Sequence, residues 1–551
     1  MTDAAPGTTE PQDAPGTTNS QNAPSATATQ DTLGTINPQD APDTIATQDT
    51  LGTTASQNAP ATTASADPGR SIVIGVDIGT SVTKAVAFAA DGTPLARASR
   101  PSRIERLPGG RVEQDLDDVV RTVTEVVRET TAALPEPPVA VALTGQGDGL
   151  WLRDAAGRPV RPAISWMDGR AADRVGTWLA DGTIQEVYAR TGSGMFPGCH
   201  APLLAWLQEH EPEVLARAAT AGYCVDAVAQ RLTGRTSLDA ADATLPFLDP
   251  VTRTYSREAL AACGIAEQAR LLPPPAPPGT VLALDRHGAE LLGLPEGLPL
   301  TAGPYDLPAC AIGSGVREPG DGVVIIGTTL ACQVLTDRAR IDPAAEPAGM
   351  WLCMPEQDRW LRAMPAMVGT AALEWVLALT GRGTDDLDGL LAASPPGARG
   401  VTALPFLSGA GERAPFVDPA ARGRLDGLTL AHTPADAVRA VCEAIGYAAR
   451  HCLETAGLTG TLAACGGGSR SGPWAQLVAA IVGRPVRIPL EEETGALGAT
   501  TVARHALGLA PATGSQAVRT LVPRQSTRDV YERGYAQYRA ELDRTRAHWS
   551  A

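Results

Sequence analysis

From Ser71 onward, hydrophobic and polar positions alternate between two periodicities. Short apolar runs bounded by glycine, aspartate or proline predict strands at residues 72–77, 84–89, 94–103, 139–144, 323–326, 462–464 and 486–488. Apolar residues at helical spacing, together with capping residues, predict helices at residues 116–133, 202–210, 434–457 and 495–507 and from residue 473 onward. Strands that alternate with helices predict an α/β protein.

The first 69 residues have no such pattern. They are rich in threonine, alanine, proline, glutamine and aspartate, lack lysine, arginine and aromatic residues, and repeat the sequence ATQDTLGT at 28–35 and 46–53. Because so few apolar side chains cannot offset the entropy of ordering, we predict a disordered low-complexity tail at residues 1–69. We do not expect a signal peptide, since this segment has neither a basic start nor an apolar core. Its eight acidic residues supply half of the net charge of −16.

The remaining stretch of about 480 residues is too long for one hydrophobic core and predicts two large domains. We place them at residues 70–317 and 318–510, followed by a C-terminal extension at 511–551. No apolar run reaches the roughly 18 residues that span a membrane, and the mildly acidic charge offers no basic surface for nucleic acid. Nine scattered cysteines without a CxxC pair favour a reducing, cytoplasmic environment over disulfides or a zinc site.

The most informative segment is an apolar strand that ends near Asp77 and turns through Gly79, Thr80 and Ser81 toward Lys84, the only lysine in the sequence. Glycine lets backbone N–H groups approach a phosphate, hydroxyls add donors and lysine adds positive charge. Asp77 could hold Mg²⁺ directly or through water. The segment therefore indicates a nucleotide-phosphate loop, although an ordinary hairpin with a solvated lysine fits it equally well.

Two later segments favour the phosphate loop. A second strand runs into a Gly-Thr-Thr turn at 327–329, about 250 residues after the first turn, and a Gly-Gly-Gly turn at 466–468 precedes a helix. Two such turns on separate domains can hold the phosphates of one nucleotide from both sides of a cleft. The sequence contains no GxxxxGK[ST] motif, which excludes a P-loop enzyme, and the Gly-Ser-Gly at 313–315 lacks the rest of a dinucleotide fingerprint.

Together the motifs resemble the FGGY family of carbohydrate kinases. In chain order they are VDIGTS (76–81), TGQGDG (144–149), ISWMDGRA (164–171), AGPYD (302–306), GTT (327–329), GGGSRSGPWAQL (466–477) and GALGAT (495–500). The resemblance spans roughly residues 71–507. It implies two actin-like, ribonuclease H-like ATPase domains around a central cleft. The first would hold the sugar site, the first phosphate loop and the catalytic base, and the second the other phosphate loop and the adenosine motif.

The resemblance also implies ATP and Mg²⁺ as cofactors and assigns roles to residues. Asp77 falls at the metal position, and the nucleotide-binding positions are Gly79, Thr80, Ser81, Lys84, Gly327, Thr328, Gly467, Gly468 and Ser471. The substrate-binding positions are Gln146, Asp148, Trp166, Asp168, Arg170 and Asp306. Asp306 also falls on the catalytic base, a role that suits a carboxylate able to take the proton of the attacking hydroxyl.

These assignments have structural alternatives. Asp306 could be a turn aspartate that follows Pro304. Asp148 and Trp166 could be an ordinary loop carboxylate and a core aromatic residue. Arg170 could simply pair with a neighbouring aspartate.

Some positions depart from the larger branches of the family. Leu203 stands where the xylulokinase pattern has a lysine. Gly147 and Asp148 stand where glycerol kinases have an arginine and a glutamate, and Gly198 stands where they have a tyrosine. These departures argue against a glycerol kinase and a standard xylulokinase. The segments GQGDGLW (145–151), PYD (304–306) and IGTTLACQV (326–334) instead resemble most the branch of erythritol and L-xylulose kinases.

We accordingly expect ATP-dependent phosphorylation of a small linear polyol or ketose. We expect no nucleic-acid or membrane partner, and the enzyme could form a homodimer. Two alternatives stay open: a non-catalytic sugar-sensing regulator on the same fold, and a kinase of a related sugar acid. Asp306 and the acidic tail, which would repel DNA, argue against the regulator.

Overall fold

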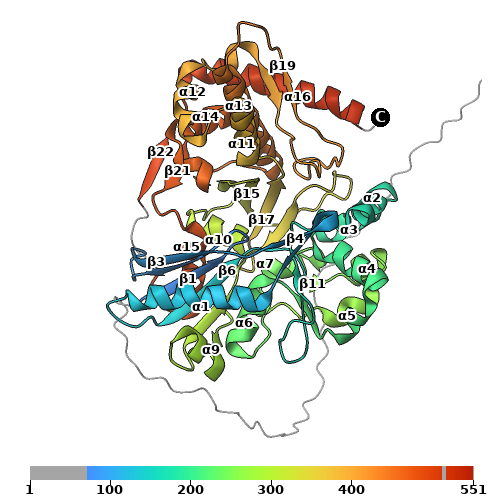
Figure 1. Ribbon diagram of the computed structural model, residues 1–551, viewed down its shortest axis with the longest axis vertical. Helices are drawn as coiled ribbons and strands as arrows, with labels where there is room; N and C mark the ends of the chain where they lie inside the picture. Colours follow the sequence, from blue (N-terminus) through green and yellow to red (C-terminus); the bar gives the residue numbers. More distant parts are fainter. Residues whose placement is uncertain (1–70, 512–516, 550–551) are drawn as a thin grey trace, which may run out of the picture. The chain divides into compact units, whose positions relative to one another are not determined.

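The computed structural model describes residues 71–511 and 517–549, and the tail predicted at residues 1–69 lies outside the described residues. Two β-sheets flanked by helices form the framework of this part of the chain (Figure 1). This arrangement confirms the α/β class that the alternating patterns predict.

The first domain is built on a six-stranded sheet with the strand order β12-β13-β6-β1-β2-β3. Its strands are β1 (Val73–Ile78), β2 (Val82–Phe88), β3 (Pro94–Pro101), β6 (Ala140–Gly145), β12 (Leu282–Ala283) and β13 (Pro299–Ala302). The first three form an antiparallel meander, whereas β1, β6 and β13 run parallel to one another. The carboxyl ends of these parallel strands therefore share one edge of the sheet, where ligands commonly bind in α/β proteins.

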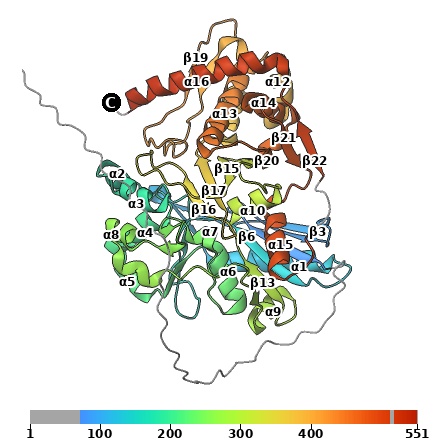
Figure 2. The same ribbon diagram turned by 180° about the vertical axis from the view of Figure 1, so that it is seen from behind.

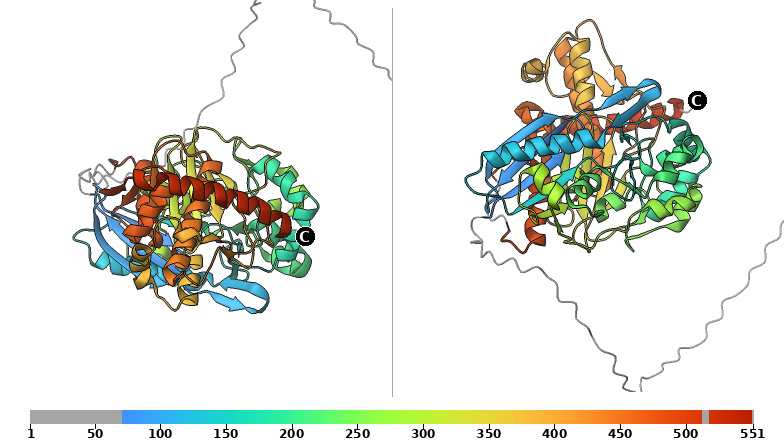
Figure 3. Two further views of the ribbon diagram at one scale, coloured as in Figure 1. Left: turned by 90° about the horizontal axis from the view of Figure 1, so that it is seen from above. Right: turned by 60° about the horizontal axis from the view of Figure 1, so that its bottom comes forward.

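Alternate residues of this sheet face different helices, as the two-residue period of a strand requires. The covering helices are α1 (Leu116–Ala132), α6 (Cys224–Thr233), α9 (Arg286–Leu292) and α15 (Thr494–Ala506). Ile74 and Val141 face α1, α6 and α9, and Figure 3 shows α1 lying across the sheet. Val73 and Ala140 face α15, where a Cβ at Gly75 would lie 2.4 Å from a backbone oxygen of that helix. Small residues on this second face therefore let α15 approach the strands closely.

The second domain repeats this architecture on a seven-stranded sheet with the order β16-β17-β15-β14-β20-β21-β22. Its strands are β14 (Gly322–Ile326), β15 (Leu330–Thr336), β16 (Met350–Cys353), β17 (Trp360–Ala366), β20 (Leu462–Cys465), β21 (Val486–Pro489) and β22 (Val518–Leu521). β14 pairs antiparallel with β15 and parallel with β20, as β1 does with β2 and β6. The partial repeat of the opening sequence pattern thus reflects a repeated sheet topology.

Five longer helices surround a single core in the second domain. They are α11 (Thr370–Leu379), α12 (Leu387–Ala393), α13 (Pro434–Ala456), α14 (Gly472–Val482) and α16 (Arg528–Trp549), with the small ribbon of β18 (Thr402–Leu404) and β19 (Arg424–Asp426) beside them. α16 contributes the buried side chains Tyr531, Tyr535, Tyr538 and Leu542 to this core. Residues 518–549 therefore complete the edge of the sheet and the core of this domain.

A third hydrophobic cluster forms around the loops and short elements inserted between β6 and β13. Besides α6 and α9, this inserted segment contains the helices α2 (Ala172–Ala180), α3 (Thr183–Thr191), α4 (His200–His210), α5 (Pro212–Arg217), α7 (Ala240–Ala243) and α8 (Arg257–Ala262). The inserted segment also contains the short strands β7 (Trp151–Arg153), β8 (Ala163–Ile164), β9 (Thr220–Gly222), β10 (Leu248–Asp249) and β11 (Thr254–Tyr255). Two further short strands, β4 (Glu105–Leu107) and β5 (Arg111–Gln114), precede β6, and β5 pairs with β8. No helix within residues 71–511 and 517–549 is both long and apolar enough to cross a membrane.

Two helices each pack on the β-sheet of the other domain. α10 (Asp306–Gly313) follows the last strand of the first sheet but packs on the second sheet, whereas α15 comes from the second half of the chain and packs on the first. The two helices lie side by side (Figure 2). A Cβ at Gly313 or Gly498 would lie 1.9 Å from a carbonyl oxygen of the other helix. Glycine at both positions therefore lets the two backbones touch where the domains join.

Candidate active site

A cavity of about 130 Å³ lies where the parallel strands of the first sheet end and the second sheet begins. Loops that follow β1 and β6 contribute Thr80, Gln146 and Asp148, the loop after β8 contributes Trp166, and the start of α10 contributes Tyr305 and Asp306. The second domain closes the cavity with Thr329, Met350, Pro365 and Arg413. The fold thus brings Gln146, Asp148, Trp166 and Asp306 together, although 160 residues of sequence separate the first from the last.

Asp306 begins α10, lines this cavity and is half-buried. Burial, together with the nearby negative charge of Asp77, raises its pKa to about 8. Asp77 lies near the end of β1, directly opposite Lys84 on β2. Burial also raises the pKa of Asp77 to about 6, although Lys84 opposes this shift. Two carboxylates whose ionised forms are disfavoured therefore lie close together beneath the cavity.

Asp148 lies on a tightly constrained loop. Its backbone is left-handed, with φ of 52°, and the next residue, Gly149, donates its N–H to the carbonyl oxygen of Gly198 over 2.9 Å. A Cβ at Gly198 would lie 1.8 Å from the backbone oxygen of Trp166, so a tyrosine could not occupy this position without moving the Trp166 loop. Burial raises the pKa of Asp148 to about 7, and the positive charge of Arg413 acts in the opposite direction.

A chain of hydrogen bonds fixes the wall of the cavity on the first domain. The indole Nε1 of Trp166 donates to the Thr80 hydroxyl over 2.8 Å, and this hydroxyl donates to Oε1 of Gln146 over 3.0 Å. Nε2 of Gln146 in turn donates to Gln114 over 2.9 Å. The Thr80 side chain, which the resemblance assigns to nucleotide binding, therefore belongs to the wall of the small cavity.

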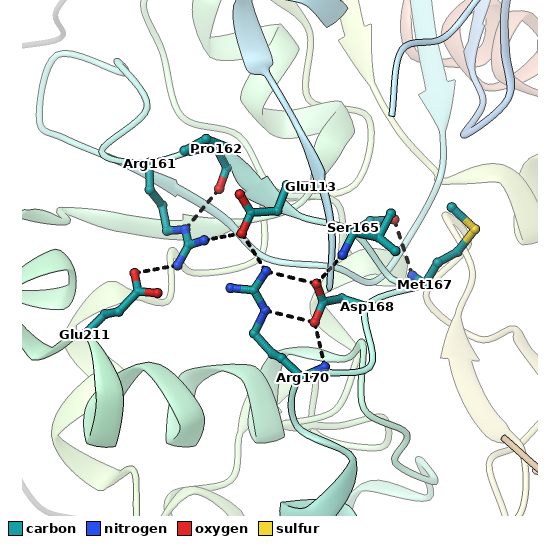
Figure 4. A network of polar contacts seen from close by, with 9 residues as sticks. Glu113, Arg161, Pro162, Ser165, Met167, Asp168, Arg170 and Glu211 are labelled. Atoms are coloured by element: carbon teal, nitrogen blue, oxygen red, sulfur yellow. Dashed lines mark hydrogen bonds and ion pairs between the residues drawn. The ribbon is translucent and has the colours of Figure 1, made fainter. Parts of the chain in front are cut away.

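Asp168 and Arg170 do not line this cavity. Arg170 donates from Nε to Asp168 over 2.9 Å and also pairs with Glu113, which binds Arg161 as well (Figure 4). Asp168 also accepts the backbone N–H of Val112 over 2.6 Å. Arg170 therefore pairs with a neighbouring aspartate, as the structural alternative for this residue predicted. The side chains of Asp168 and Arg170 hold the loop that carries Trp166.

The residues assigned to the nucleotide lie beside the opening of the cleft. Lys84 forms an ion pair with Glu493 over 2.8 Å, and Lys84, Gly466 and Gly467 line one cavity of about 380 Å³. Gly467 has open space at its Cβ position, whereas a Cβ at Gly468 would lie 2.3 Å from a side-chain carbon of Ile326. Gly468 therefore lets the turn pack on β14 while Gly467 leaves its outer surface open.

Hydrogen bonds anchor three more of the residues assigned to the nucleotide: Gly327, Thr328 and Ser471. In the turn after β14, the carbonyl oxygen of Gly327 accepts the backbone N–H of Thr370 over 2.9 Å, and that of Thr328 accepts the N–H of Ala371 over 3.3 Å. Ser471 caps α14 by accepting the N–H of Trp474 over 3.2 Å and donates to Asp388 over 2.6 Å. The start of α11 thus supports the turn, and Ser471 fixes the start of α14. Gly79 and Ser81 lie in the turn between β1 and β2, where Ser81 is exposed.

The donor set beneath the cavity fits Mg²⁺ bound together with a nucleotide. A magnesium ion usually takes one or two protein carboxylates and completes its shell with phosphate oxygens and water. Asp77 supplies such a carboxylate, and Gly495 on α15 leaves the space beside it, since a Cβ there would lie 2.9 Å from Asp77 Oδ2. In residues 71–511 and 517–549 no three His, Cys, Asp or Glu side chains are arranged to hold a metal by themselves.

The second domain contributes residues to this cavity that the sequence patterns did not indicate. Arg413 lies in a loop between two short strands, about a hundred residues after the end of α10, and no periodicity points to it. The available signal was local: a Glu-Arg pair in the glycine- and proline-containing segment GAGERAPF (409–416). Met350 and Pro365 read as ordinary strand residues and gave no signal.

The sequence matches two family profiles that together cover most of the chain. The N-terminal domain of the FGGY family of carbohydrate kinases matches residues 72–313, and the C-terminal domain of that family matches residues 322–507. The chain belongs to the FGGY family and is a carbohydrate kinase. This confirms the predicted family and enzyme class.

Among characterised relatives, an erythritol kinase of Brucella abortus is 32% identical over 462 residues, 80% of this chain and 88% of that protein. A xylulose kinase of Escherichia coli is 30% identical over 453 residues, 79% of this chain and 90% of that protein. The crystal structure of a xylulose kinase from Rhodospirillum rubrum superposes with a TM-score of 0.77 at 29% identity, covering 87% of this chain and all of that one. The two-domain fold is therefore that of known carbohydrate kinases.

Proposed function

We propose that this kinase transfers the terminal phosphoryl group of Mg-ATP to a hydroxyl of a small, neutral, linear polyol or ketose. Asp306 is the general base. The observation that carries the proposal is its position: a half-buried carboxylate that lines a small cavity together with Thr80 and Thr329 of the two Gly-Thr turns, near Asp77. The similarity to an erythritol kinase and a xylulose kinase supports the substrate class.

Asp306 would accept the proton of the attacking hydroxyl as its oxygen bonds to phosphorus and the bond from phosphorus to the nucleoside diphosphate breaks. Gln146 and Asp148 would hold other hydroxyls of the substrate, and Trp166 would cover its apolar face. Within the cavity wall, the bond from Trp166 to Thr80 fixes the indole ring before substrate arrives. Asp168 and Arg170 would position this loop without touching the substrate.

The nucleotide would extend from the Gly-Thr turns toward the cavity lined by Lys84 and Gly467. Lys84 and the backbone N–H groups of residues 79–81 and 327–329 would bind phosphate oxygens, and Gly467, Gly468 and Ser471 would support the adenosine. Asp77 would hold the divalent cation, which when bound offsets the charge of the phosphates. A cation here would also favour the ionised form of Asp306.

The test is ADP release measured with erythritol, xylitol, D-xylulose, L-xylulose and glycerol, each at saturating Mg-ATP. The proposal expects turnover stimulated by at least one four- or five-carbon substrate. Asp306→Asn should bind that substrate with near-native affinity and lower turnover by roughly 10²–10⁴. Sugar binding without ADP release would instead identify the protein as a regulator. Near-native turnover by Asp306→Asn would show that Asp306 is not the general base.

A further inference from the structure

Arg413 of the second domain lines the same cavity as Asp148 and Asp306 of the first domain. It lies in the loop that joins β18 to β19. Its positive charge opposes the rise in the pKa of Asp148, so the two side chains lie near each other on the cavity wall.

The guanidinium group is held in place by contacts that leave part of it free. Its Nε donates to the carbonyl oxygen of Pro365 over 2.9 Å, and its plane lies over the ring of Phe196, 4.2 Å from the centroid. Its Nη1 is buried and has no hydrogen-bond partner among the residues that the structure describes. Leaving a buried donor without a partner is costly, so this orientation favours a ligand that supplies an acceptor.

The neighbouring carboxylate of Glu412 holds the loop that carries Arg413 in place. Oε1 of Glu412 accepts the backbone N–H of Met367 over 2.7 Å and that of Arg413 over 2.9 Å. The backbones of Glu412 and Asp418 also exchange hydrogen bonds of 3.0 and 2.9 Å across the loop. The arginine is thus presented by a rigid loop, which reduces the entropy lost when it binds a ligand.

The other cations near the site have partners of their own. Arg170 pairs with Asp168 and Glu113, and Lys84 pairs with Glu493. Within the described part of the chain, Arg413 is therefore the cationic side chain on the wall of this cavity.

Resting on the proposed function, we propose that Arg413 is a specificity-determining residue that donates hydrogen bonds to a hydroxyl or carbonyl oxygen of the substrate other than the phosphorylated hydroxyl. Asp148, facing it, accepts a hydrogen bond from the same or the adjacent hydroxyl. Arginine is suited to this role because its planar fork offers donors in a fixed direction. The substrate would thereby bridge the two domains.

The experiment compares Arg413→Gln with Arg422→Gln, an exposed arginine nine residues further along whose guanidinium binds only backbone carbonyl oxygens. Substrate binding without ATP is measured by calorimetry, and KM values for substrate and ATP by ADP release. We expect Arg413→Gln to raise both the Kd and the KM for substrate by about 10- to 100-fold, the size of one hydrogen bond to a charged group. The KM for ATP should change less than twofold, and Arg422→Gln should behave like the unmodified enzyme.

A series of monodeoxy substrates provides the readout that loss of structure would not produce. One deoxy analogue should bind the unmodified enzyme 10- to 100-fold more weakly than the parent, and Arg413→Gln should no longer distinguish the two. If Arg413→Gln does not fold, Arg413→Lys retains the charge and the packing on Phe196 and should show the same loss of discrimination in part. Unchanged substrate affinity, or full discrimination retained in a folded variant, would overturn the inference. No stimulation of the unmodified enzyme by any substrate would instead refute the proposed function.

Discussion

Asp306, Asp77 and Asp148 are acidic residues whose protonation is set by the protein around them. All three are half-buried, and burial is the main reason that their pKa values rise to about 8, 6 and 7. A general base is most effective when its pKa lies near the working pH, so this environment suits Asp306 for the role we propose. The same environment predicts how the reaction responds to pH.

We expect kcat/KM for the substrate at low Mg-ATP to rise with pH and to level off above about 8. The reason is that the base acts as a carboxylate, and burial beside Asp77 raises the pKa of Asp306 to about 8. Saturating Mg-ATP should move this limb to lower pH, because a cation near Asp77 favours the ionised form. Initial rates between pH 5.5 and 9.5 provide the measurement. A flat profile over this range would contradict the assignment of Asp306.

Lys84 provides a second prediction for a single residue. We expect Lys84→Ala to raise the KM for ATP by about tenfold or more, since a hydrogen bond to a charged group is worth about 1.5–3 kcal/mol. Lys84→Arg should be milder. The matched control is Arg97→Ala, because Arg97 lies on the neighbouring strand and pairs with Glu491, close in sequence to the partner of Lys84. Equal KM values for ATP in Lys84→Ala and the unmodified enzyme would make Lys84 an ordinary surface residue.

At the scale of elements, the contact between α10 and α15 joins the domains directly beside the proposed base. Asp306 begins α10, and Gly495 near the start of α15 packs against Asp77. Backbone contacts at Gly313 and Gly498 leave no room for a side chain between the two helices. The position of both carboxylates therefore depends on glycine at these positions.

We expect Gly498→Ala to destabilise the protein by about 1–3 kcal/mol, the usual cost of overpacking, because the new methyl group would meet the carbonyl oxygen of Ala309 at 1.9 Å. The matched control is Gly176→Ala in α2, where the Cβ position has no atom within 4 Å. There alanine should stabilise the helix by about 0.5–1 kcal/mol, because it loses less backbone entropy than glycine. Denaturant unfolding measures both changes, and equal shifts for the two variants would contradict this account of the contact.

At the scale of the whole molecule, the charge around the cavity should select neutral substrates. Asp148 and Asp306 line the cavity and Asp77 lies beneath it, while Arg413 is the cation that faces them. Arg170, the arginine that the sequence offered as a partner for an acid, is already paired with Asp168 and Glu113. An additional carboxylate would therefore enter a site that already disfavours the ionised forms of its own carboxylates.

We expect a neutral four- or five-carbon polyol or ketose to exceed its aldonic acid in kcat/KM by at least about tenfold, or roughly 1.4 kcal/mol of differential transition-state binding. Paired assays of erythritol, xylitol and L-xylulose against the matching acids, followed by ADP release, provide the measurement. Equal or faster turnover of the acids would show that Arg413 acts as a carboxylate clamp, and would favour the sugar-acid alternative.

Short-range chemistry explains why much of the fold could be predicted. The helix predicted at 434–457 is α13, Pro434–Ala456, because Thr433 and Asp436 cap its start and Gly457 ends it in the left-handed conformation with φ of 89°. The hairpins around Asp77 and the glycine-rich turn near Gly467 likewise follow from the residues within them. Turns of this kind are local structures, so the motifs were sufficient to identify the family.

Only the tertiary structure decided which residues meet at the cavity. In the folded protein Arg413 lines the cavity, Asp168 and Arg170 form an ion pair outside it, and the indole of Trp166 donates a hydrogen bond to the Thr80 hydroxyl. The tertiary structure also placed α15 on the sheet of the other domain. The local sequence could establish turns, caps and periodic faces, because these depend on residues a few positions apart. Contacts between distant segments depend on how whole sheets and helices pack, which no single segment encodes.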